Sequence, residues 1–134
     1  MKGFAIFFGI LLLAAGAAGF VPALSPDGQL LGIFTVDTMH NVVHIATGIL
    51  AIAMGVAGVV QARMIFRVVG VVYAVIAVMG FVAGKDGHVM GMAMNMADHV
   101  LHTAIAVLGL ALGFAYGLRA TPPDPNRGPD LRGI

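Results

Sequence analysis

The chain has 134 residues, of which 60% are hydrophobic and 10% charged, and its formal net charge at pH 7 is +1. A soluble globular domain carries about 25% charged residues, so this composition indicates an integral membrane protein. No basic patch is present that could bind nucleic acid, and the absence of cysteine excludes disulfides, thiolate chemistry and iron–sulfur clusters.

Four apolar stretches follow one another and predict an all-α fold, an integral membrane four-helix bundle. A membrane-spanning helix needs about 20 predominantly apolar residues, and each stretch comes close to this length or exceeds it. The stretches cover residues 3–21, 38–60, 68–83 and 96–118. The first one also fits a signal peptide, but we interpret it as a retained span.

The domain organisation follows from these stretches. We expect residues 1–118 to form one four-span transmembrane domain in contact with membrane lipid. Residues 119–134 contain four prolines and are expected to be a disordered cytoplasmic tail. A longer connection is expected at 22–36, where Ser-Pro-Asp-Gly is a turn signature, and a short one at 61–67.

The basic residues of a four-span arrangement lie mostly on one side of the membrane. Lys2, Arg63, Arg67 and Arg119 share that side, and only Lys85 falls on the other. The positive-inside rule then places both termini in the cytoplasm. All five histidines lie on the extracytoplasmic side, and this clustering is the most informative feature of the sequence.

The two halves of the sequence resemble each other, which predicts two repeated transmembrane hairpins. The first copy covers about 1–60 and the second about 61–118. Matched positions include Gly19 with Gly80, Asp37 with Asn95, Asn41 with His99, His40 with Asp98, and His44 with His102. Both copies enter the membrane from the same side, so the pseudo-twofold axis would lie along the membrane normal. This symmetry could bring His44 and His102 close together.

Three segments carry a resemblance to a known family: Gly-Phe-Val-Pro at 19–22, Asp-Gly-Gln-Leu-Leu-Gly at 27–32 and His-Asn-Val-Val-His at 40–44. They resemble the signature of small bacterial four-span membrane proteins known only as a domain of unknown function. The second signature of that family is matched by Asn95, Asp98 and His102, while His99 stands where Asn is usual. The resemblance implies a bacterial inner-membrane protein and brings no activity with it.

The candidate site consists of polar residues at the start of the second and fourth spans. Ionisable groups in membrane helices usually face the bundle interior, so we expect His44 and His102 to face each other. The metal ligand set predicted for zinc or copper is His40, His44, Asp98, His99 and His102. Two facing histidines could instead hold haem b. A purely structural, hydrogen-bonded cluster is the interpretation we favour, with Asn41, Asp37 and Asn95 as its further members; the last two are also N-cap candidates.

Methionines follow one another between the third and fourth spans, at positions 90, 92, 94 and 96. Thioethers together with His88 are soft ligands that would suit copper(I). Methionine also fills irregular apolar space at interfaces, and we favour this second interpretation.

No catalytic constellation is recognisable, since the chain has one serine, no cysteine and no glutamate. We therefore expect a protein that is not an enzyme. Two classes of function remain. The first is a non-catalytic accessory or structural subunit that associates with other membrane subunits or with itself. The alternative is a membrane protein that binds copper, zinc or haem.

Overall fold

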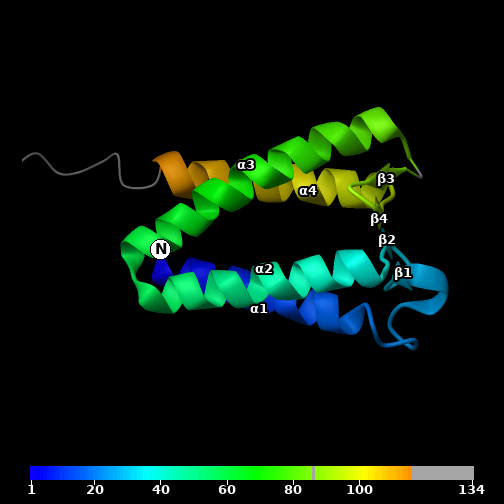
Figure 1. The fold of residues 1–134 in the computed structure, drawn as a ribbon, viewed down its shortest axis with the longest axis horizontal. Helices are drawn as coiled ribbons and strands as arrows, with labels where there is room; N and C mark the ends of the chain where they lie inside the picture. Colours follow the sequence, from blue (N-terminus) through cyan, green and yellow to red (C-terminus); the bar gives the residue numbers. More distant parts are fainter. Residues whose placement is uncertain (86, 116–134) are drawn as a thin grey trace, which may run out of the picture.

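The computed structural model describes residues 1–85 and 87–115, so the expected tail 119–134 lies outside the described residues. Within that part the fold is mostly helical (Figure 1). The four α-helices are α1 (Lys2–Ala18), α2 (Thr38–Ala57), α3 (Val59–Ala83) and α4 (Met96–Leu110). A π-helical turn, η2 (Ala111–Ala115), continues α4.

Three of these helices are long and apolar enough to cross a membrane. They are α2, α3 and the continuous segment Met96–Phe114 that begins with α4. The remaining helix α1 has 17 residues and ends at Ala18, three residues before the predicted end of the span at Val21. At about 1.5 Å per residue its length lies at the lower limit of what can span a bilayer.

The helices pack as two pairs, α1 with α2 and α3 with α4 (Figure 1). Glycines allow close contact within each pair. A Cβ atom on Gly9 would lie 2.6 Å from the carbonyl oxygen of Gly48, and one on Gly109 would lie 2.8 Å from the Cα of Gly70. Such small residues let two backbones approach each other where apolar burial gives no driving force. Gly9 and Gly48 are therefore engaged in the contact between α1 and α2.

Two short antiparallel ribbons lie at the same end of the molecule (Figure 1). In the first, β1 (Gln29–Leu30) pairs with β2 (Phe34–Thr35), and in the second, β3 (His88–Val89) pairs with β4 (Met92–Ala93). We refer to this end as the ribbon end. The sequence analysis predicted no strands. The missed signal is turn chemistry, because Leu-Gly and Met-Gly adopt positive φ at 31–32 and 90–91, as a tight hairpin turn requires.

The connection between α2 and α3 is shorter than expected. Only Gly58 separates the two helices, whereas the sequence predicted a connection at 61–67. These residues form the first turns of α3 instead. Arginine is a good helix former, so Arg63 and Arg67 extend the helix beyond its apolar part. Near this end the Arg67 Nε atom donates a 2.8 Å hydrogen bond to the carbonyl oxygen of Gly113.

The two predicted N-caps are confirmed, and both lie at the ribbon end. The carboxylate of Asp37 accepts a 2.8 Å hydrogen bond from the backbone amide of His40 at the start of α2. Asn95 caps α4 in a capping box, in which its side chain accepts from the amide of Asp98 and the Asp98 carboxylate accepts from the amide of Asn95. The caps fix where each histidine-bearing helix begins.

Candidate metal centre

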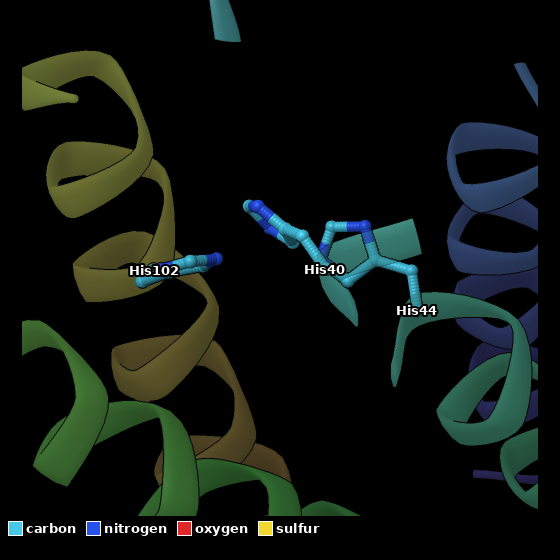
Figure 2. A group of neighbouring side chains, drawn as sticks. All are labelled: His40, His44 and His102. Atoms are coloured by element: carbon cyan, nitrogen blue, oxygen red, sulfur yellow. The ribbon is translucent and has the colours of Figure 1, made fainter. Parts of the chain in front are cut away.

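Three histidines converge beside the ribbons, two from α2 and one from α4. Each of His40, His44 and His102 offers one ring nitrogen, and these nitrogens all lie within 4.8 Å of one another. Figure 2 shows His102 projecting from α4 toward the two rings on α2. Because His40 and His44 are four residues apart, they stand on the same face of their helix. The prediction that His44 and His102 face each other agrees with this arrangement, as their ring centroids are 6.4 Å apart.

Two of the three histidines are buried and the third is partly exposed. His40 is 1% exposed and His102 is 2% exposed, while His44 is half-buried. The ring of His40 meets that of His44 edge to face, with centroids 4.5 Å apart. The centroid of the His102 ring lies 5.8 Å from that of His40. A buried imidazole nitrogen needs a hydrogen-bond partner or a bound ion, because hydrogen-bonding atoms buried without one are destabilising.

The hydrogen bonding of His40 leaves one of its nitrogens free to act as a ligand. Its Nδ1 atom lies 3.3 Å from the carbonyl oxygen of Ala93, so a proton on Nδ1 is directed to that oxygen. The Nε2 atom is then a lone-pair donor, and it is buried with no hydrogen-bond partner among the described residues. Nδ1 of His102 is likewise buried and unpartnered in this part of the chain. Metal-ligating histidines usually donate their second ring N–H to a carbonyl or carboxylate in this way.

A small cavity of about 10 Å³ lies among the rings. This volume is near the lower limit for one water molecule, so the space fits a single small ion or water. Besides the three histidines, it is lined by Val43, Tyr73, Ile76, Met92 and Met94. The ring of Tyr73 meets that of His102 edge to face, with centroids 5.2 Å apart. The sequence analysis did not single out Tyr73, whose place inside an apolar stretch gave no distinct signal.

Asp98 and His99, predicted as ligands with the other three, lie elsewhere in the structure. The Asp98 carboxylate accepts hydrogen bonds from the backbone amides of Asn95 and Thr35, at 2.8 and 3.1 Å. His99 is fully buried against α3, where its Nε2 atom lies 3.0 Å from the carbonyl oxygen of Gly84. The structure therefore brings together three of the five predicted ligands. The exposed ring of His88 also lies outside the cluster.

Asp37 and Asn95 connect the two helix pairs through each other's ribbons. The carboxylate of Asp37 accepts a 2.6 Å hydrogen bond from the backbone amide of Ala93 in β4. The side-chain amide of Asn95 donates a 2.7 Å hydrogen bond to the carbonyl oxygen of Ile33, in the loop between β1 and β2. With the Asp98–Thr35 bond, each capped helix start is tied to the ribbon of the other pair. These crossed hydrogen bonds hold His40 and His102 at a fixed separation.

The Asp37 carboxyl is held in its charged form by these contacts. Partial burial opposes ionisation, but the hydrogen bonds from the amides of Ala93 and His40 and the nearby His40 ring outweigh it and keep the pKa of Asp37 below its ordinary value. A charged acceptor makes stronger hydrogen bonds than a neutral one. The predicted structural role of Asp37 is therefore compatible with its environment.

Asn41 and His99 each fill the space over a glycine of the partner helix. A Cβ atom on Gly19 would overlap the Asn41 side chain, and one on Gly80 would overlap the His99 ring. Asn41 is 2% exposed, and its Oδ1 atom has no hydrogen-bond partner among the described residues. Both side chains thus belong to helix packing within a pair rather than to the histidine cluster between the pairs.

The model of one protein family matches the chain over residues 2–115, which is most of its length. The chain belongs to the family of the domain of unknown function DUF4383. The resemblance seen in the sequence is thereby confirmed, and the apolar helices agree with a membrane protein. No curated protein and no solved structure matches the chain.

Proposed function

We propose that this protein is a membrane protein that binds one transition-metal ion through His40, His44 and His102. The convergence of three ring nitrogens within 4.8 Å around a small cavity carries the proposal. In the sequence the structural, hydrogen-bonded cluster was the favoured alternative. That alternative requires polar partners for the rings, yet His40 Nε2 and His102 Nδ1 have none among the described residues.

The geometry fits the dimensions of a metal–imidazole site. Nitrogens bound to one tetrahedral zinc ion at about 2.0–2.1 Å are about 3.3 Å apart. The histidine nitrogens lie within 4.8 Å of one another, so binding would draw them together by up to about 1.5 Å. Imidazole suits zinc and copper, and His40 already has its second ring nitrogen on a carbonyl oxygen. A porphyrin is far larger than the cavity of about 10 Å³, which favours a single ion over haem at this site.

We also propose that the chain crosses the membrane four times, as a four-helix bundle with both termini in the cytoplasm. The basic residues support this orientation. Lys2 begins α1, and Arg63 and Arg67 lie in the first turns of α3, at the end of the molecule opposite to the ribbons (Figure 1). The three histidines would then lie at the extracytoplasmic ends of α2 and α4.

A duplicated helix pair is the origin that we propose for this arrangement. Matched positions make matched contacts, since Gly19 packs on Asn41 as Gly80 packs on His99. The amide of Val36 donates to the carbonyl oxygen of Gly28 as that of Met94 donates to Gly87. The ribbons differ by one residue, because three residues separate Leu30 from Phe34 and two separate Val89 from Met92. The offset between matched positions accordingly changes by one across the ribbons, from 59 residues between Gly28 and Gly87 to 58 between Val36 and Met94.

Metal binding can be tested on the full-length chain purified in mild detergent. The protein is loaded separately with zinc and copper, freed of excess metal and analysed by mass spectrometry for bound metal. We expect about one equivalent in the unaltered protein and a loss of stoichiometric metal in His44→Gln, because two imidazoles cannot complete the site.

A matched control is His88→Gln, which changes an exposed histidine at the same end of the molecule. It should bind as much metal as the unaltered protein. Equal metal content in the two variants, or no bound metal in the unaltered protein under either loading, would overturn the proposal. Circular dichroism of each variant separates a lost ligand from a lost fold.

A further inference from the structure

Two methionines complete the lining of the histidine cavity. Met92 belongs to β4 and Met94 follows it directly, and their side chains are 4% and 2% exposed. Both line the same cavity as His40, His44 and His102. The other methionines of this segment point away from it, since Met90 is 70% exposed and Met96 45% exposed. Two methionines of this segment are therefore buried at the cavity that the three imidazoles line, and the other two are not.

Among residues 1–85 and 87–115, no carboxylate lines this cavity. The two aspartates closest in sequence to the ligands are already engaged by backbone amides. Asp37 accepts from Ala93 and His40, and Asp98 accepts from Thr35 and Asn95. The side chains with possible ligand atoms that line the cavity are thus three imidazoles, two thioethers and the Tyr73 hydroxyl, and the rest of the lining is valine and isoleucine.

A buried, neutral and soft donor set discriminates between metal ions in two ways. The penalty for moving an ion out of water grows with the square of its charge, so a monovalent ion enters such a cavity more easily than a divalent one. Thioether sulfur is a soft ligand that selects copper(I), whereas zinc is bound in proteins by imidazole, thiolate and carboxylate. Methionine is unbranched and has three rotatable bonds, so its sulfur can adjust to an ion held by the histidines.

We infer that the ion bound at this site is copper(I), held by His40, His44 and His102 together with a thioether of Met92 or Met94. The inference rests on the proposed function and adds the identity of the ion. It gives the methionine-rich segment a binding role, which the sequence alone did not favour over simple space filling. The protein then belongs to the proteins that hold or pass on copper(I) at the extracytoplasmic face of a membrane.

The experiment uses the full-length chain in detergent, without oxygen, and two pairs of substitutions. Copper(I) affinity is measured by competition with a chromogenic copper(I) chelator, and zinc binding is measured separately by equilibrium dialysis. In the double variant Met92→Leu/Met94→Leu we expect copper(I) affinity to fall by about tenfold or more, at least as much as for a changed outer-shell partner. Zinc binding should stay nearly the same, because the histidines are untouched. Leucine conserves volume, so the fold should be kept.

The double variant Met90→Leu/Met96→Leu is the matched control, because it removes two exposed methionines of the same segment. It should bind copper(I) like the unaltered protein. X-ray absorption of the copper-loaded protein should show a sulfur neighbour that the Met92→Leu/Met94→Leu variant lacks.

The outcomes separate this inference from the proposed function. Zinc or copper(II) binding that needs the histidines, with the same copper(I) affinity in both methionine variants, would overturn the inference and leave the three-histidine site standing. X-ray absorption that shows only nitrogen ligands around copper(I) would likewise overturn the inference and leave the three-histidine site standing. Failure to bind any of these ions would overturn both.

Discussion

The carboxylate of Asp37 accepts a 2.6 Å hydrogen bond from the backbone amide of Ala93, which lies 56 positions further along the chain. The same carboxylate caps α2 through the amide of His40. One side chain therefore fixes both the start of the helix that carries two of the histidines and the position of the ribbon next to them. The carbonyl oxygen of Ala93 in turn accepts from the His40 ring, so Ala93 contacts both the cap residue and the first histidine of α2.

Asp37→Asn should destabilise the protein by about 1–3 kcal/mol, because a charged acceptor of two amide hydrogen bonds is replaced by a neutral amide. The measurement is the free energy of unfolding in mixed micelles, followed by circular dichroism. Asp27→Asn makes the same chemical change at an exposed turn residue of the first connection, where asparagine also tolerates the positive φ of 53°. It should change the free energy of unfolding by less than about 0.5 kcal/mol. Equal effects of the two substitutions would contradict the role of Asp37.

Gly80→Ala should destabilise the α3–α4 pair, because the added methyl group would overlap the buried His99 ring. Overpacking of this kind costs about 1–3 kcal/mol. Gly3→Ala is the control, since a Cβ atom there meets nothing within 4 Å and alanine is the better helix former. Thermal unfolding in detergent measures both variants. Adding His99→Ala to Gly80→Ala should recover part of the loss, and no recovery would show that the clash is not with this ring.

The proposed orientation predicts which single cysteines react from outside the cell. The chain has no cysteine of its own, so each introduced thiol is the only one present. Ile33→Cys, in the exposed loop of the first ribbon, should react with a membrane-impermeant maleimide on intact cells. Val60 lies beside the α2–α3 connection and is 76% exposed. The variant Val60→Cys should react only after the cells are permeabilised. The reverse pattern would show that the histidine site faces the cytoplasm.

Association with other membrane subunits, or with a second copy, is a separate prediction from the sequence. The first span is rich in glycine and alanine, which suit close helix contacts, and the structure packs two of these residues, Gly9 and Gly16, against α2. We expect native gels of the source membrane in mild detergent to show the protein in an assembly larger than the 13.8 kDa monomer. A copper-chelator treatment before electrophoresis would tell whether the assembly depends on metal. Migration as a monomer in several mild detergents would contradict the prediction.

Much of the fold could be predicted because it depends on local sequence. The apolar stretches predict helices, and the capping residues Asp37 and Asn95 predict where two of them begin, since a cap is formed with an amide three residues away. The spacing of His40 and His44 places them on one helix face for the same local reason. The ribbons were missed because each strand has only two residues, too few for an alternating pattern to be recognised.

The composition of the site was decided by the tertiary structure. His99 and His102 lie in the same turn of α4, and at 3.6 residues per turn their side chains diverge by about 60°. This divergence directs His99 to the carbonyl oxygen of Gly84 and His102 to the rings on α2. By itself the sequence determined four apolar segments, the caps of two of them and one pair of histidines on a shared face. Which third histidine joins that pair, and which methionines line the cavity, depends on how the helix pairs pack, because side-chain direction relative to a partner is set by contacts between residues far apart in the chain.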